Sequence, residues 1–121
     1  MNKGKRGVVT MTGNGIVTVP GDARMNIAEI ADLFGIYYRE AKRHIRAIEK
    51  AGIAQGDYTM SCIADGLKVY PEYYGLEMII ALSFRIQSKN AQELRKWILL
   101  KAGAADSRIE ALLYSKNIVL N

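Results

Sequence analysis

The sequence has little of what forms covalent cross-links, metal sites or membrane spans. Among its 121 residues there is one cysteine, Cys62, and one histidine, His44. A single cysteine cannot form an intrachain disulfide, and these two residues are too few for a Cys/His zinc site. The longest nearly apolar run, Leu76 to Leu82, is far shorter than the roughly 20 residues that cross a bilayer. These absences exclude a disulfide scaffold and a zinc finger, and they favour a cytoplasmic protein with no membrane partner.

Motifs for nucleotide binding and catalysis are also missing. Gly13 and Gly15 lack the third glycine of a dinucleotide fingerprint, and no Gly-Lys-Ser/Thr sequence offers a phosphate-binding loop. The stretch after Lys5 and Arg6 is broken by Thr, Gly and Asn, which is unlike the apolar region of a signal peptide. The carboxylates are scattered, with no tight pair for acid–base chemistry. We therefore expect no catalytic residue, no cofactor and no metal ion.

The composition is that of an ordinary globular protein, but its positive charge is concentrated in one region. Half of the residues are hydrophobic and 24% are charged, which fits a single domain over 1–121. The formal net charge is +5, and residues 1–56 carry nine basic and five acidic side chains, a net of +4. Between positions 39 and 50 alone, five basic residues stand against two acidic ones. This concentration favours a polyanionic partner.

Two β-hairpins are predicted, each around a turn that ends in glycine. Residues 8–19 alternate loosely around Asn14-Gly15, with strands expected near 8–12 and 16–19. Residues 57–70 alternate around Asp65-Gly66, and Pro71 is expected to close this second hairpin.

Residues 26–52 predict a helix, a glycine turn and a second helix. Asn26 and Glu29 have the spacing of a capping box, and apolar residues follow at helical spacing until Gly35. The second helix is expected from Tyr38 to Lys50. Its apolar face would carry Ala41, His44, Ile45 and Ile48. The opposite face would carry Arg39, Lys42, Arg43, Arg46 and Lys50.

Helices are also expected over residues 75–115. Leu76 to Ile86 is apolar nearly all round, which predicts a helix buried on most sides. Asn90 and Glu93 repeat the capping signal for a helix that runs to about Ala102. A bend at 102–104 and a last short helix over 105–115 would follow.

Several single residues have a structural interpretation. His44 is expected to be buried against the first helix, Cys62 to be a small buried residue in a strand, and Trp97 to lie in the core. Three tyrosines are expected to seal the junction between the second hairpin and the buried helix: Tyr70, Tyr73 and Tyr74.

The helix–glycine–helix segment is the strongest functional signal. A helix-turn-helix needs a small residue where its helices meet, here Ala31, and a glycine in the turn, here Gly35. Its second helix presents its outer face to the major groove of DNA, N-terminal residues first. The residues expected to bind DNA are Tyr37, Tyr38, Arg39, Lys42, Arg43 and Arg46, with Lys68 on the second hairpin as a backbone contact. Two packed helices with a solvated basic face remain the alternative.

Residues 73–88 resemble a segment of the virulence RhuM family. The sequence Tyr-Tyr-Gly-Leu-Glu-Met-Ile-Ile, followed by Arg-Ile-Gln-Ser, is similar to that family's Tyr-Tyr-Asn-Leu-Asp-Met-Ile-Ile and Arg-Val-Asn-Ser. Leu-Arg-Lys-Trp at 94–97 resembles its Phe-Arg-x-Trp. A more distant resemblance is to the DNA-binding modules of phage antirepressors and viral Bro proteins. The resemblance implies a bacterial mobile-element or phage-like context and DNA binding, and it supplies no mechanism.

The sequence therefore predicts an α+β, winged helix-turn-helix-like domain. It would have an N-terminal hairpin, a second hairpin as the wing, and C-terminal helices. The expected function is non-catalytic binding of double-stranded DNA, as a transcriptional regulator or a mobile-element module. A homodimer on a palindromic site would suit so small a domain. The alternative is a protein–protein interaction module with a degenerate helix-turn-helix whose basic face docks an acidic partner.

Overall fold

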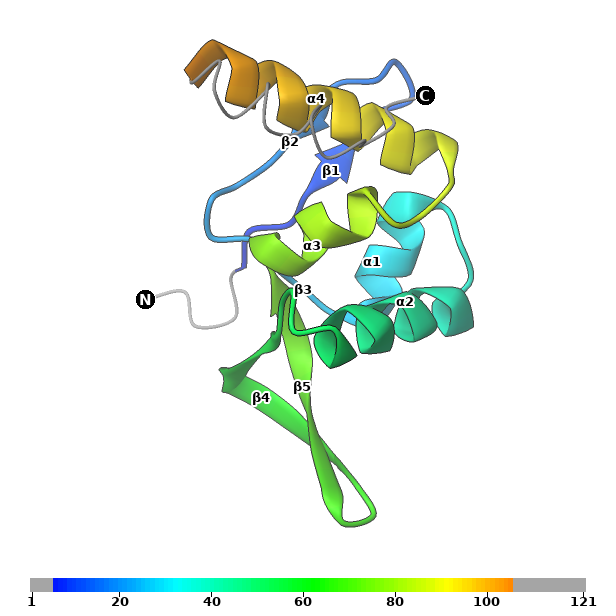
Figure 1. Ribbon diagram of the computed structural model, residues 1–121, viewed down its shortest axis with the longest axis vertical. Helices are drawn as coiled ribbons and strands as arrows, with labels where there is room; N and C mark the ends of the chain where they lie inside the picture. Colours follow the sequence, from blue (N-terminus) through cyan, green and yellow to red (C-terminus); the bar gives the residue numbers. More distant parts are fainter. Residues whose placement is uncertain (1–5, 106–121) are drawn as a thin grey trace.

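The computed structural model describes residues 6–105, in which four helices and two small antiparallel sheets form an α+β fold (Figure 1). The elements in chain order are β1 (Thr10–Met11), β2 (Val17–Thr18), β3 (Arg24–Met25), α1 (Ile27–Phe34), α2 (Tyr38–Lys50), β4 (Gly56–Asp65), β5 (Lys68–Gly75), α3 (Leu76–Ser83) and α4 (Lys89–Ala105). Most of the helix predicted over 105–115 lies outside the described residues. No described helix is both long and apolar enough to cross a membrane.

The N-terminal hairpin is present, with strands shorter than the sequence predicts. Strands β1 and β2 pair at only two positions, Thr10 with Thr18 and Met11 with Val17. The turn is closed by the Gly15 amide, which donates to the Thr12 carbonyl at 3.0 Å. Gly15 has φ +83, a left-handed conformation that glycine adopts without steric cost.

Helices α1 and α2 form as predicted because their ends are specified locally. The Glu29 amide donates to Asn26 Oδ1 at 2.8 Å, and the Asn26 amide donates to Glu29 Oε1 at 2.9 Å. This is a complete capping box. Gly35 ends α1 with φ +67, where glycine avoids the steric cost of a Cβ atom. The chain then turns into α2, which buries Ala41, Ile45 and Ile48.

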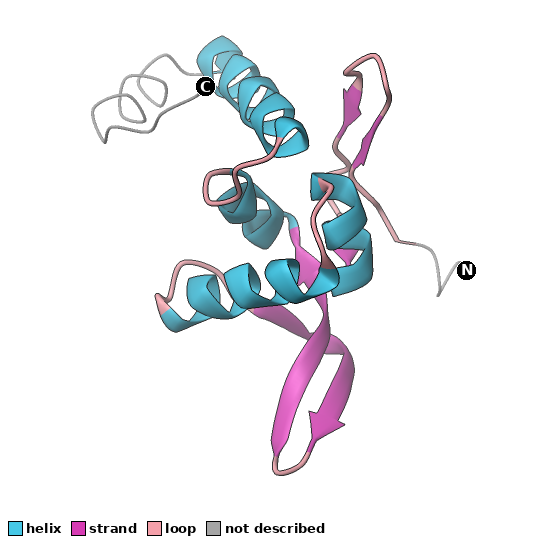
Figure 2. Cartoon of the chain, turned by 90° about the vertical axis from the view of Figure 1, so that its right-hand side faces the viewer, coloured by secondary structure: helices cyan, strands magenta, loops and turns pink. Residues whose placement is uncertain are grey.

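The larger sheet has the strand order β3-β5-β4, and β3 is an element that the sequence does not reveal. Arg24 pairs with Gly75 and Met25 with Tyr74, so β3 covers only one end of β5. The remainder of β5 pairs with β4 alone and forms a hairpin that projects from the helices (Figure 2).

The second hairpin is longer than predicted, and the prediction that Pro71 closes it is wrong. Strand β5 continues through Pro71, which pairs with Cys62, and ends at Gly75. Proline is tolerated here because β3 does not reach this part of β5, and because the β4–β5 register is irregular beside it. The turn consists of Gly66 and Leu67 rather than the predicted Asp65-Gly66, since Asp65 pairs directly with Lys68.

The C-terminal helices differ from the prediction at their ends. Helix α3 ends at Ser83 rather than at Ile86. Helix α4 begins at Lys89, and the Ser88 hydroxyl accepts a hydrogen bond from the Ala91 amide at 3.1 Å. Asn90, the predicted cap, instead donates to the Leu33 carbonyl at 2.9 Å and ties α4 to α1. Helix α4 continues through the predicted bend at 102–104 to Ala105.

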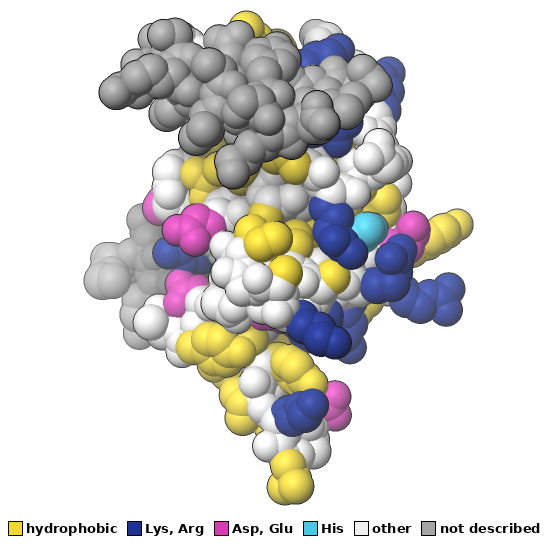
Figure 3. All heavy atoms as spheres, viewed as in Figure 1, with side chains coloured by type: hydrophobic (Ala, Val, Ile, Leu, Met, Phe, Trp, Pro, Cys, Tyr) yellow, Lys and Arg dark blue, Asp and Glu magenta, His cyan; other side chains and the backbone are white. Residues whose placement is uncertain are grey.

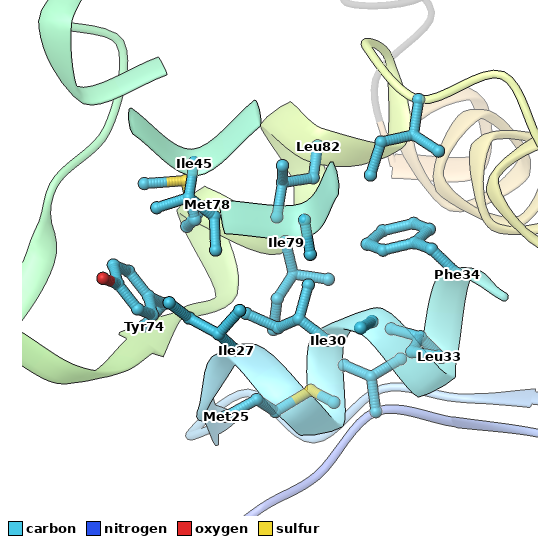
Figure 4. Close-up of a cluster of buried hydrophobic side chains, with 14 of the residues drawn as sticks. Met25, Ile27, Ile30, Leu33, Phe34, Ile45, Tyr74, Met78, Ile79 and Leu82 are labelled. Carbon is cyan, nitrogen blue, oxygen red and sulfur yellow. The ribbon is translucent and has the colours of Figure 1, made fainter. Parts of the chain in front are cut away.

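The hydrophobic core lies between α1, α2, α3 and β5 (Figure 4). Phe34, Ile45, Ile79 and Leu82 are almost completely buried there. Helices α1 and α2 contribute the apolar faces that their periodicity predicts, and burial of these side chains is the main source of stability. Trp97, predicted as core, is partly buried against this cluster, and the Lys101 Nζ atom lies 5.6 Å from its ring centroid.

Candidate nucleic-acid interface

The outer face of α2 carries the basic residues that the sequence singles out. Because Ala41, Ile45 and Ile48 face the core, Arg39, Lys42 and Arg43 are exposed on the other side of the helix. Within residues 6–105 these three cations form no ion pair. Figure 3 shows dark blue side chains gathered over α2 and next to the histidine. The charged groups of these three side chains are therefore accessible to an anionic ligand.

Two aromatic side chains stand at the start of α2. Tyr37, at the N-cap position, is 77% exposed, and Tyr38 is 54% exposed. The Tyr37 amide donates to Glu40 Oε1 at 3.3 Å, which turns that carboxylate toward the helix start. The structure thus brings Tyr37, Tyr38 and Arg39 together at one exposed helix end.

A groove separates α2 from the β4–β5 hairpin. Tyr38, Lys42 and Arg46 line its α2 side, whereas residues 63–65 and 70–72 line its hairpin side. Asp65 and Glu72 belong to the hairpin side, so the groove combines both charge signs. Lys42 is the exposed cation of the α2 side.

Arg46 differs from its basic neighbours because its guanidinium group has partners within the protein. One of its terminal nitrogens donates to Glu49 Oε1 at 2.9 Å and to the Tyr74 hydroxyl at 3.0 Å. Its Cζ atom lies 4.4 Å from the centroid of the Tyr70 ring. Burial raises the pKa of the Tyr74 hydroxyl, while the hydrogen bond from Arg46 lowers it in part. The sequence groups Arg46 with the accessible cations, and the structure separates it from them.

Lys68 lies at the far end of the hairpin. It is exposed and pairs with Asp65 across the two-residue turn, in which Gly66 has φ +65 and Leu67 is fully exposed. Lys68 is not among the residues that line the groove beside α2, although its cross-strand partner Asp65 is.

His44 is not buried against the first helix, so that prediction is wrong. The side chain is partly exposed, and its Nδ1 atom accepts a hydrogen bond from Arg85 Nε at 3.0 Å. His44 lies at the edge of the apolar face of α2, from which it reaches the segment after α3. Burial, followed by the charges of Arg43 and Arg85, lowers the pKa of His44. Arg85 extends the basic surface beyond α2, and no local sequence pattern points to it.

Cys62 is exposed, so the prediction of a buried cysteine is also wrong. Beyond its first residues β4 projects away from the helices and has no core to cover it (Figure 1). Among the described residues, no three His, Cys, Asp or Glu side chains lie together as a metal site would require.

The three tyrosines of β5 have different partners. Tyr74 is completely buried and binds Arg46, and Tyr70 stacks on the same guanidinium group. The Cζ atom of Arg6 lies 4.6 Å from the Tyr73 ring centroid, and Arg6 also pairs with Glu29. These contacts join the base of the hairpin to α2 and to the N-terminal segment, whereas the sequence predicts a junction with the buried helix that follows the hairpin.

Comparisons of the chain with protein-family models, with curated proteins and with solved structures found no match.

Proposed function

We propose that this chain is a non-catalytic DNA-binding protein with a winged helix-turn-helix fold. The element order β3-α1-α2-β4-β5 supports this assignment, because α1, the Gly35 turn and α2 form a two-helix unit that is followed by a hairpin. In this proposal α2 is the recognition helix in the major groove of double-stranded DNA, and the β4–β5 hairpin is the wing.

The observation that carries the proposal is the exposed basic surface that Arg39, Lys42 and Arg43 form on α2, where none of the three has an ion pair within residues 6–105. Lys42 and Arg43 neutralise backbone phosphates, because their charges have no ion-pair partner within residues 6–105. Tyr37, Tyr38 and Arg39 stand at the N-terminal end of the helix, from which a recognition helix reaches base edges. Lys68 on the hairpin contacts the backbone of the same duplex.

The biological setting is inferred from the resemblance to the virulence RhuM family and to phage antirepressor modules. Both imply a bacterial mobile-element or phage-like context and DNA binding, which fits a transcriptional regulator or a mobile-element module. A domain of this size covers limited DNA surface, so specific regulation calls for a homodimer on a palindrome.

The experiment that tests the proposal compares two charge-reversed proteins on immobilised duplex DNA. Lys42→Glu/Arg43→Glu should abolish retention at moderate salt, because it turns two phosphate ligands into repelling groups. Lys89→Glu/Lys101→Glu makes the same change in net charge on exposed positions of α4 and should leave retention unchanged. Equal loss in both proteins would mean that only net charge matters, and would contradict an interface on α2. Selection of random duplexes on the parent protein would then reveal the recognised sequence.

One observation favours a second candidate function, a protein-interaction module. The hairpin exposes several apolar side chains, among them Ile63, Leu67 and Val69. Apolar side chains that gather into one exposed patch are typical of protein contacts, and this alternative requires that these side chains do so with a bound partner. This alternative predicts no retention of the parent protein on duplex DNA and its co-purification with a protein instead.

A further inference from the structure

We infer that Arg46 is a positioning residue for DNA binding, which holds the β4–β5 hairpin at a fixed orientation to α2 so that Lys68 reaches the duplex that α2 binds. This inference rests on the proposed function and assigns Arg46 a role other than that of a phosphate ligand.

The contacts of Arg46 all lie at the junction of α2 with β5. The guanidinium group donates to the Tyr74 hydroxyl at 3.0 Å, lies 4.4 Å from the Tyr70 ring centroid, and pairs with Glu49 of its own helix at 2.9 Å. A planar guanidinium can stack and donate in its plane at the same time, which the ammonium group of lysine cannot do. One side chain thus binds β5 at two residues and is itself held in place by α2.

The hairpin needs such a contact because its own ladder is broken near its base. Asp57 pairs with Tyr73 and Cys62 pairs with Pro71, so residues 58–61 of β4 lie opposite Glu72 alone. Strand β3 supports β5 only at Tyr74 and Gly75. Beyond that point the hairpin is a two-stranded ribbon, which is marginally stable without further packing. Its direction is therefore not fixed by the sheet itself.

Arg46 contacts β5 on both sides of this irregularity. Tyr74 lies on the core side of the irregularity at Glu72, and Tyr70 lies on its outer side. The Tyr74 side chain is completely buried and so provides a fixed point for the guanidinium group. Through Arg46 the orientation of the outer hairpin, including Lys68, is coupled to α2.

Lys42 is the contrasting residue on the same groove. It also lines the α2 side, but it is exposed and has no ion-pair partner within residues 6–105. A phosphate can bind Lys42 without breaking any contact, whereas Arg46 would have to exchange an ion pair and a stacked ring. The two residues should therefore affect DNA binding in different ways.

The test measures how duplex affinity depends on salt, because the slope of log K against log salt counts phosphate contacts at about 0.9 unit each. Lys68→Met should lower the slope of the parent protein by about 0.9 unit. Arg46→Lys keeps the positive charge, and Tyr74→Phe changes a buried hydroxyl that DNA cannot reach. Each should lower the slope as much as Lys68→Met does, and adding Lys68→Met to either should lower it no further. Thermal unfolding of each variant checks that the domain is folded.

Three results would overturn the inference. If Arg46→Lys and Tyr74→Phe keep the parent slope and the full Lys68→Met effect, the hairpin is positioned without Arg46. If the slope changes add in the double variants, Arg46 and Lys68 act independently. If Lys68→Met has no effect in the parent protein, the hairpin does not reach the backbone. Failure of the proposed function looks different, because then the parent protein itself binds no duplex, and the inference falls with it.

Discussion

The Nε atom of Arg85 donates a hydrogen bond to Nδ1 of His44 across 3.0 Å. This contact joins α2 to the segment after α3, and it requires that the accepting ring nitrogen carry no proton. Burial and the neighbouring charges of Arg43 and Arg85 lower the pKa of His44, against the opposite effect of Glu40. Protonation of His44 therefore works against the folded state.

The first prediction is a loss of stability between neutral and mildly acidic pH. Between its lowered pKa in the folded state and about 6.5, His44 binds more protons in the unfolded chain than in the folded one, so the free energy of unfolding falls as the pH is lowered through this range. Urea unfolding at pH values on either side of 6.5 would measure this decrease. His44 is the only histidine, so His44→Gln should remove most of the pH dependence in this range. The same pH dependence in both proteins would contradict the assignment.

The second prediction concerns Asp57 at the base of the hairpin. Hydrogen bonds from Thr59 and from Arg24 lower the pKa of Asp57 to about 2. A carboxyl group with a lowered pKa stabilises the folded state above its unfolded pKa of about 3.9, and this contribution is lost as the pH falls toward the folded value. Asp57→Asn should therefore have a lower free energy of unfolding than the parent protein at neutral pH. Near pH 2 the two free energies should become similar.

A matched control for Asp57 is Asp32→Asn, which changes an exposed carboxylate on α1 with no ion pair in the described part of the chain. Thermal unfolding across the acid range would compare the three proteins. If Asp57→Asn is as stable as the parent at neutral pH, the Arg24–Asp57 contact does not stabilise the fold.

The third prediction tests the turn between α1 and α2. Gly35 has φ +67, and a Cβ atom there would come no closer than 3.6 Å to Asn90, so the cost of Gly35→Ala is one of backbone conformation. That cost is about 1–2 kcal/mol in the left-handed region. Gly13→Ala is the control, because its added Cβ meets nothing within 4 Å and its φ lies outside that region. Equal unfolding free energies for the two variants, from urea titration, would contradict this account of the turn.

Elements that are specified by neighbouring residues are predictable from the sequence. The capping box of Asn26 and Glu29, the Gly35 turn and the periodicity of α2 all act within a few residues, and the helices form where these signals place them. The exposure of Arg39, Lys42 and Arg43 follows from the same periodicity.

Features that depend on distant residues are not predictable in this way. Strand β3 has two residues and exists because Met25 meets Tyr74, 49 positions later in the chain. The position of Arg46 on α2 suggests an exposed cation. Its guanidinium group instead contacts Tyr70 and Tyr74 of β5. Cys62 is in the predicted strand, but the hairpin projects from the helices, so this part of the strand packs on no core and Cys62 is exposed (Figure 2).

The most direct test of the central claim is the salt dependence of duplex binding, measured by fluorescence anisotropy between about 50 and 200 mM salt. For the parent protein log K should fall linearly with log salt. Lys42→Met/Arg43→Met should reduce the slope by about 1.8 units, and Lys89→Met/Lys101→Met should leave it unchanged. An unchanged slope in the α2 variant, or equal changes in both, would contradict the claim that the exposed face of α2 binds the phosphate backbone.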